Sequence, residues 1–329
     1  MTTPRTTPRT SARSSAHTSA RPAAEHGEPP TRPTTSAEPA MPSRKTSQLK
    51  PALCFLAPAV LALVVLRLLP AGMAVVDSLH HHSLTDGVTR FVGLDNYGDL
   101  FHDPQFRDSI LVTLVFSLVI NPLQVAAALA LAVFFNRRFA GARFWRSLVF
   151  LPIAVPPAVS AVIWSILYRP EGPLNALLHT LGLPDQRFLT SPEQALPSLI
   201  VLMSWVGVGY WMTFLIAGLQ DIPGEVYDAC AVDGASAWQR FTRITLPLLR
   251  RPLAFVLVAD TVANFLVFAP VQLLTQGGPE GSTNLMMYDV FRRAYSVGDI
   301  HYAEAEVVLL VAITLVVVGV QYRLMRGEE

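Results

Sequence analysis

The chain has 329 residues, of which 51% are hydrophobic and only 15% charged, and its formal net charge at pH 7 is +1. A soluble domain carries about 25% charged residues, so this composition argues against a soluble globular protein. The net charge says little by itself, whereas the positions of the charges along the chain indicate a topology.

The first 47 residues are rich in Thr, Ser, Ala, Pro and Arg and contain few apolar side chains. Such a segment cannot bury enough apolar surface to offset the entropy lost on ordering. We therefore expect a disordered cytoplasmic tail over residues 1–47, followed by a membrane domain over residues 48–329. A transit peptide, which is also rich in Arg and Ser and poor in acids, is the alternative interpretation of the tail.

Six hydrophobic stretches follow, each long enough for a helix that crosses a bilayer, which needs about 20 residues. They cover residues 52–76, 108–135, 147–168, 195–219, 253–275 and 304–322. A helix satisfies its own backbone hydrogen bonds in lipid, whereas a β-barrel would show short segments of alternating polarity. The sequence therefore predicts an all-α integral membrane protein with six transmembrane helices.

The basic residues predict how these spans are oriented. Most of the 25 Lys and Arg residues lie in the N-terminal tail, the 136–146 turn, the 220–252 loop and the C-terminus. Positively charged loops stay on the cytoplasmic side. We therefore expect a multi-pass protein of the cell membrane with both termini in the cytoplasm, which agrees with an even number of spans.

The three opposite loops, residues 77–107, 169–194 and 276–303, are then external. Glu304 and Glu306 stand where the sixth span begins, so we expect both at the outer membrane interface, with docking of an external protein as a second interpretation. None of the external loops is large enough to form a domain. We therefore expect that any dilute ligand outside the membrane is captured by another polypeptide and not by this chain.

The cytoplasmic loop 220–250 is too polar and too interrupted by glycine to lie in the bilayer. Pro223 predicts that a helix begins after Gly224, and Gly234 provides a break at which the chain can turn. A second helix is expected over residues 236–245, with the serine at its start as the cap. Two short helices joined at a glycine form a compact amphipathic projection that fits a groove on a partner.

This loop resembles the cytoplasmic "EAA" loop of binding-protein-dependent ABC importer permeases, which docks onto a separate ATPase. The resemblance is carried by Ile222, Pro223, Glu225, Asp228, Ala229, Cys230, Asp233, Gly234, Ala235, Ile244, Thr245, Leu246 and Pro247. It implies that the ATPase contacts are made by Glu225, Asp228, Ala229, Cys230, Asp233, Gly234 and Pro247. Asp228 and Cys230 stand where the family usually has Glu and Ala, and Asp228 keeps the charge on a side chain shorter by one methylene.

The resemblance extends over most of residues 50–326. GLDNYGDLF (93–101), FLPIAVPPAVSAVIW (150–164) and TQGGP (275–279) resemble the first outer loop, the third core helix and the turn after the fifth helix of these permeases. The most similar subgroup is that of the maltose-type, or carbohydrate-uptake, permeases in their six-helix form. The resemblance implies the type I ABC importer permease fold and an ATP-driven importer for a sugar, oligosaccharide or related polyol.

A path for the solute is suggested by polar residues in the fifth span, where Asp260, Asn264 and Gln272 follow a helical spacing with Phe268 between them. Carboxylate and amide groups suit sugar hydroxyls, and aromatic faces suit sugar rings. By resemblance, the solute contacts fall on Asp260, Asn264, Val267, Gly207, Tyr210, Ile153 and Pro157. The alternative is that the polar groups hydrogen-bond between helices.

No phosphate-binding GxxxxGK[ST] loop, nucleophile elbow or zinc-binding helix occurs in the sequence, so we expect no enzymatic activity in this chain. The run His80–His82 lacks the spacing of a metal site. We expect Cys54 in a membrane helix and Cys230 in the cytoplasm, which argues against a disulfide between them. We expect no cofactor here, because ATP and Mg²⁺ are bound by partner ATPase subunits.

The expected partners are a second homologous permease subunit, an ABC ATPase dimer, an external solute-binding protein and membrane lipid, but not nucleic acid. An ABC permease for a non-sugar solute, an ion-coupled secondary transporter, and a membrane sensor or scaffold are the alternative functions.

Overall fold

The structure is a computed structural model that describes residues 49–82, 89–137 and 139–326. The predicted tail, residues 1–47, lies outside the described residues. Contacts divide the chain into two units, Met1–Leu56 and Ala57–Glu329. The first helix, α1 (Leu49–Leu63), crosses this boundary, and every later element belongs to the second unit.

The predicted helical membrane spans are confirmed at five of the six places. Five described segments are long and apolar enough to cross a membrane: Phe55–Asp77, Pro104–Phe135, Pro192–Gln220, Arg250–Leu274 and Ile300–Met325. The first combines the end of α1, a π-helical turn over Val64–Leu68 and α2 (Leu69–Asp77). The sixth place holds a bent pair of helices, so the count is six if that pair forms one span.

The third span is not the continuous helix that the sequence predicted over residues 147–168. Helix α5 (Ala142–Phe150) runs into a 3₁₀ turn over Leu151–Ala154, and α6 (Pro157–Leu167) starts afresh at an angle of 100°. Pro156 and Pro157 explain the break, because a residue before proline is driven out of the helical region. Val155 and Pro156 are accordingly extended, with ψ of 124° and 141°.

The fifth span is also interrupted. Helix α12 (Arg250–Phe265) ends well before the expected residue 275, and α13 (Ala269–Leu274) begins after a short non-helical stretch. Asp260 and Asn264 therefore share one helix face, but Gln272 lies on α13. The expectation that the helical spacing extends from Asp260 to Gln272 is wrong, because the helix does not continue through Leu266–Phe268.

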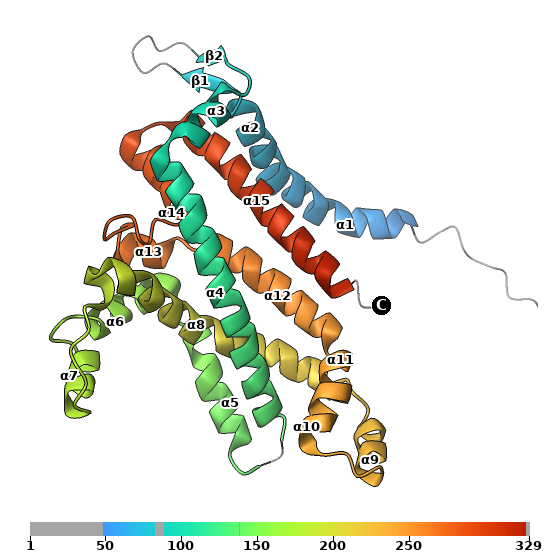
Figure 1. Cartoon of the computed structure of the whole chain (residues 1–329). Helices are drawn as coiled ribbons and strands as arrows, with labels where there is room; N and C mark the ends of the chain where they lie inside the picture. The colour runs from blue at the N-terminus through green and yellow to red at the C-terminus, as the bar shows by residue number, and fades with distance from the viewer. Residues whose placement is uncertain (1–48, 83–88, 138, 327–329) are drawn as a thin grey trace, which may run out of the picture. The chain divides into compact units, whose positions relative to one another are not determined.

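Two long helices, α4 (Pro104–Phe135) and α8 (Pro192–Gln220), pack along each other and against α12, while α15 (Ile300–Arg326) packs on α12 and α2 (Figure 1). Helix α5 approaches α8 at Gly209, where an added Cβ would lie 2.0 Å from the carbonyl oxygen of Val149. This backbone-to-backbone contact is possible only because Gly209 has no side chain.

The segments between the spans are more ordered than plain loops. The first holds a two-stranded antiparallel hairpin, β1 (His80–His82) with β2 (Thr89–Phe91), followed by α3 (Asp95–His102). The others hold α7 (Pro173–Thr180) and α14 (Met286–Phe291). The all-α prediction therefore holds for the membrane part, and the hairpin is the exception to it.

Candidate functional site

The loop between the fourth and fifth spans folds as two short helices, as predicted. Helix α9 (Gly224–Val232) starts at Gly224 itself, one residue earlier than expected, directly after the extended Pro223. Helix α10 (Ala237–Arg240) continues through a π-helical turn over residues 241–245 and through α11 (Leu246–Leu248) towards α12. We call residues 224–245 the elbow; it projects at the end of α8 (Figure 1).

The bend of the elbow depends on Gly234, whose φ of +71° lies in the left-handed region. The N–H of Gly234 donates to the carbonyl of Ala231 at 3.2 Å, and the N–H of Ala235 donates to that of Cys230 at 3.0 Å. These bonds satisfy the last carbonyls of α9 in the manner of a glycine C-cap. Residues with a Cβ adopt this conformation at a cost of about 1–2 kcal/mol.

Two further sets of contacts hold the elbow together. Ser236 and Gln239 form a reciprocal capping box: the Ser236 N–H donates to Gln239 Oε1 at 2.8 Å, and the Gln239 N–H donates to Ser236 Oγ at 3.2 Å. The hydroxyls of Tyr227 and Thr245 lie 3.1 Å apart and tie α9 to the turn that leads into α12. A side-chain hydrogen bond therefore links α9 to the turn that leads into the fifth span.

The surface of the elbow exposes large apolar side chains together with charged ones of both signs. Val232 is 88% exposed and Trp238 is 71% exposed. The Trp238 ring lies 5.9 Å, centroid to centroid, from that of Phe241, and tryptophan is among the residues that contribute most to protein interfaces. The predicted contact residues Glu225, Asp228, Ala229, Asp233, Gly234 and Pro247 are all exposed, and Cys230 is half-buried with a free thiol.

The polar residues of the fifth span lie in a buried network. Asp260 is 1% exposed, and its Oδ1 accepts hydrogen bonds from Trp211 Nε1 at 2.6 Å and from Asn264 Nδ2 at 3.2 Å. Asn264 Nδ2 also donates to Asn121 Oδ1 at 2.7 Å, and Asn121 Nδ2 donates to Thr261 Oγ1 at 2.9 Å. The network therefore joins α4, α8 and α12.

Several members of this network were not singled out from the sequence. Asn121 and Gln124 come from α4, and Gln321 of α15 donates to Thr261 Oγ1 at 2.9 Å. The signal for Asn121 and Gln124 was present, since both are amides inside the apolar stretch 108–135 and buried polar groups in a span require partners. These contacts support the hydrogen-bonding role between helices, and contact with a solute stays a prediction.

The other predicted path residues divide into two groups. Gly207 and Tyr210 lie beside the network, because Gln124 fills the space over Gly207 and the Tyr210 ring lies 4.7 Å from that of Trp211. Val267 is 6% exposed and packs in an apolar cluster, and its N–H donates to the Asn264 carbonyl at 3.4 Å.

Ile153 and Pro157, in contrast, are exposed at the bend of the third span. Ile153 belongs to the 3₁₀ turn before the bend, and Pro157 is the first residue of α6. Neither takes part in the hydrogen bonds of the buried network, although the turn that holds Ile153 packs against α8, and their contact with a solute stays a prediction.

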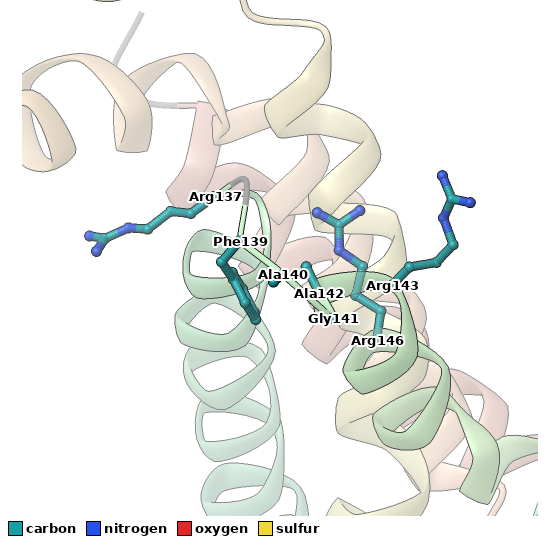
Figure 2. Close-up of a pocket in the computed structure, with 7 residues that line it drawn as sticks. All are labelled: Arg137, Phe139, Ala140, Gly141, Ala142, Arg143 and Arg146. Carbon is teal, nitrogen blue, oxygen red and sulfur yellow. The ribbon is translucent and has the colours of Figure 1, made fainter. Parts of the chain in front are cut away.

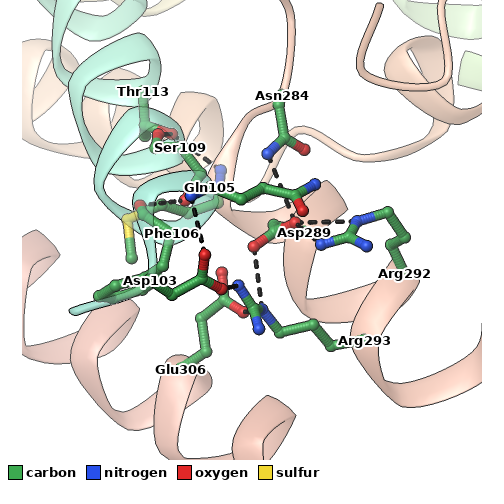
Figure 3. A network of polar contacts seen from close by, with 11 residues as sticks. Asp103, Gln105, Phe106, Ser109, Thr113, Asn284, Asp289, Arg292, Arg293 and Glu306 are labelled. Atoms are coloured by element: carbon green, nitrogen blue, oxygen red, sulfur yellow. Dashed lines mark hydrogen bonds and ion pairs between the residues drawn. The ribbon is translucent and has the colours of Figure 1, made fainter. Parts of the chain in front are cut away.

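A second polar cluster lies at the opposite ends of the helices from the elbow. Arg293 is 2.5 Å from a carboxylate oxygen of Asp103, 3.0 Å from one of Asp289 and 3.0 Å from one of Glu306 (Figure 3). Arg292 lies 2.7 Å from Asp289. Arg293 thus joins the start of α4, the end of α14 and the first turns of α15.

The cluster is largely buried. The side chains of Asp289 and Glu306 are 0% exposed and that of Arg293 is 13% exposed. Glu306 is therefore enclosed by protein and paired with Arg293, and its expected position at the outer membrane interface stays a prediction. Burial raises the pKa of Asp103, but the hydrogen bonds from Arg293 and from the Gln105 N–H outweigh it and lower that pKa overall.

Comparisons with known proteins agree with this arrangement. Residues 124–327 match the family described as "Binding-protein-dependent transport system inner membrane component". The chain is 32% identical over 274 residues to the sn-glycerol-3-phosphate transport system permease protein UgpA of Escherichia coli O6:K15:H31, covering 83% of this chain and 92% of that protein. The corresponding protein of Brucella abortus is 33% identical over 270 residues, with coverages of 82% and 92%.

Among solved structures, this chain is similar to a chain from the crystal structure of a bacterial ABC transporter involved in the import of the acidic polysaccharide alginate. It matches with a TM-score of 0.74 and 23% identity, over 85% of this chain and 99% of the other. Another match, equal in TM-score, is to a bacterial alginate ABC transporter in complex with an alginate pentasaccharide-bound periplasmic protein. At 23% identity the similarity shows the fold alone, and it confirms the predicted helical fold.

Proposed function

The chain belongs to the family of binding-protein-dependent transport system inner membrane components, where it is a permease subunit of an ABC importer, and we propose that its elbow receives the motion of a partner ATPase. The observation that carries this proposal is the exposure of large apolar side chains on the elbow, with Val232 88% and Trp238 71% exposed. A rigid projection with such a surface fits a groove on a partner protein.

The contacts of the elbow supply a route from that partner to the membrane helices. The Tyr227–Thr245 hydrogen bond ties α9 to the turn before α12. From α12, the bonds of Asp260 and Asn264 reach α8 and α4. A displacement of the elbow therefore moves α12 together with the helices hydrogen-bonded to it, which supports a coupling of ATP binding to rearrangement of the bundle.

The assembly we propose contains two permease subunits, this chain and a homologous partner, above two ATPase subunits that hold ATP and Mg²⁺. An external solute-binding protein delivers the solute. The elbow and both termini face the cytoplasm in this arrangement, which the distribution of basic residues supports. The chain itself performs no covalent chemistry.

We propose a sugar, an oligosaccharide or a related polyol as the solute. Support comes from the relatives, named for transport of sn-glycerol-3-phosphate, and from the carboxylate and amide groups beside Gly207 and Tyr210. An ABC permease for another class of solute and an ion-coupled secondary transporter are the rivals, and they differ in what drives uptake and in what competes for it.

The test is uptake by the complete complex in proteoliposomes, with the cognate binding protein outside and ATP inside. We expect uptake of labelled polyol phosphates or oligosaccharides that requires internal ATP and persists when a protonophore collapses the proton gradient. Uptake that is independent of the ATPase and abolished by the protonophore would indicate a secondary transporter. ATP-driven uptake of amino acids or phosphate alone would retain the importer and overturn the solute class.

A further inference from the structure

The turn between α4 and α5, residues 136–146, carries a concentration of positive charge that the transport cycle described above does not use. We call it the basic turn. Arg137, Arg143 and Arg146 line a cavity of about 570 Å³ together with Phe139 and the turn around Gly141 (Figure 2). Arg143 and Arg146 lie on one side of the turn, and Arg137 extends from the other.

In the part of the chain that the structure describes, no carboxylate neutralises the charges of Arg137, Arg143 and Arg146. The sequence contains no Asp or Glu from residue 109 to residue 170. Within the described residues, none of the three arginines forms an ion pair with a carboxylate. Arg146 is held by a hydrogen bond from its Nε to the Phe135 carbonyl at 3.0 Å, at the end of α4. This bond neutralises no charge, and Arg137 and Arg143 are exposed.

The position of the basic turn places this charge at a membrane surface. It joins the last residue of a span, Phe135, to the first helix of the bent third span. Aromatic side chains surround it: Phe139 is 38% exposed, Phe144 66% and Trp145 48%. Exposed aromatic residues at the ends of spans are typical of the head-group level of a bilayer.

We propose that the basic turn binds the phosphate of an anionic phospholipid head group. A guanidinium group presents a planar set of donors that matches a phosphate. Basic pockets beside membrane helices attract anionic lipid, with roughly a fivefold gain in affinity for each arginine near the surface. The aromatic residues supply the apolar contact that a lipid offers and that free phosphate lacks. The proposal does not depend on the transported solute.

The experiment is native mass spectrometry of the purified full-length chain with equal amounts of phosphatidylglycerol and phosphatidylcholine. We expect preferential retention of phosphatidylglycerol, a loss of roughly fivefold in apparent affinity for Arg143→Gln or Arg137→Gln, and a larger loss for the double variant. Arg90→Gln, which removes an exposed arginine of the hairpin strand β2, is the control and should leave retention unchanged. Inorganic phosphate should not displace the lipid.

Equal retention of the two lipids, equal loss in the Arg90 control, or displacement by inorganic phosphate would overturn the proposal. A second measurement uses no arginine variant, so it stays informative if those variants fail to fold. Brominated phosphatidylglycerol in nanodiscs should quench more fluorescence of the wild-type chain than brominated phosphatidylcholine does, and Trp145→Phe should remove this difference. A difference that persists without Trp145 would place the preferred lipid elsewhere.

Discussion

The indole nitrogen Nε1 of Trp211 lies 2.6 Å from Asp260 Oδ1, which joins α8 to α12 through a buried hydrogen bond to a carboxylate. The same oxygen accepts a bond from Asn264, while Oδ2 of Asp260 accepts none from the described residues. Asp260 thus holds the helices together through one oxygen and keeps a second acceptor in the same buried place.

This arrangement predicts different effects for two substitutions at Asp260. Asp260→Ala leaves the buried Trp211 N–H unpaired, whereas Asn264 keeps its bond to Asn121, so we expect the free energy of unfolding to fall by about 1–3 kcal/mol. Asp260→Asn keeps an acceptor oxygen for Trp211 and should be clearly the more stable of the two. Denaturation of the purified chain in detergent measures both.

Transport then separates the two interpretations of this residue. If Asp260 contacts solute hydroxyls as well, the Asp260→Asn complex should lose uptake or change its solute preference while it still binds the ATPase. If Asp260→Asn takes up solute at the wild-type rate and with the same preference, the role of Asp260 is limited to the hydrogen bonds between helices.

The ionic cluster predicts an asymmetry between two adjacent arginines. Arg293→Met removes the ion-pair partner of the fully buried Glu306, and breaking a buried pair from one side costs about 3–5 kcal/mol. Arg292→Met removes a partner only of Asp289, at a side chain that is 25% exposed, and should be milder. Thermal unfolding of the two variants compares these effects.

The double variant Arg293→Met/Glu306→Gln provides the control for this prediction. The second substitution removes the Glu306 charge that Arg293→Met leaves unpaired. The double variant should therefore recover part of the lost stability, because the effects of residues in contact are not additive. Equal destabilisation by Arg293→Met and Arg292→Met would show that Glu306 is not stabilised by Arg293. The same would follow if the stability lost in the double variant equalled the sum of the losses for Arg293→Met and Glu306→Gln measured alone.

The close approach of α5 to α8 predicts that Gly209 tolerates no side chain. A Cβ there would meet a backbone carbonyl oxygen, which cannot rotate away, so Gly209→Ala should destabilise the protein by about 1–3 kcal/mol. Gly319→Ala, on α15 with no atom within 4 Å of the new Cβ, is the matched control and should not destabilise it. Similar melting temperatures for the two variants would refute the packing of α5 on α8.

The bend of the elbow predicts a graded response at Gly234. Proline fixes φ near −65° and is incompatible with the observed +71°, so Gly234→Pro should abolish uptake while the protein still reaches the membrane. Gly234→Asn should be tolerated best, because asparagine adopts the left-handed conformation more readily than other residues. Gly224→Ala, at a helical position with open space around it, should transport normally. Normal uptake by Gly234→Pro would contradict the role of the elbow.

Local sequence signals predicted the elbow well, because its structure depends on near neighbours. Pro223, Gly234 and the Ser236 cap act within a few residues, and the helices form where those residues require. The bend of the third span had a local signal as well, the pair Pro156–Pro157, but hydrophobic length alone does not reveal a break.

The buried clusters were harder to predict, because their members are distant in sequence. Asp103 and Arg293 are separated by 190 positions, and the burial of Glu306 depends on its contact with Arg293 from the chain after α14. For the network around Asp260, the amides of α4 could have been suspected, but the pairing of Trp211 with Asp260 follows only from the crossing of α8 and α12.

Binding of an ATPase by the elbow is tested by recovery of that partner from solubilised membranes with the tagged full-length chain. We expect the wild-type chain and Tyr295→Ala, which alters a residue 78% exposed outside the elbow, to recover a nucleotide-binding ATPase. Trp238→Ala should weaken the association by about 2 kcal/mol and recover little. Failure of the wild-type chain to recover an ATPase, or equal recovery by Trp238→Ala, would contradict it.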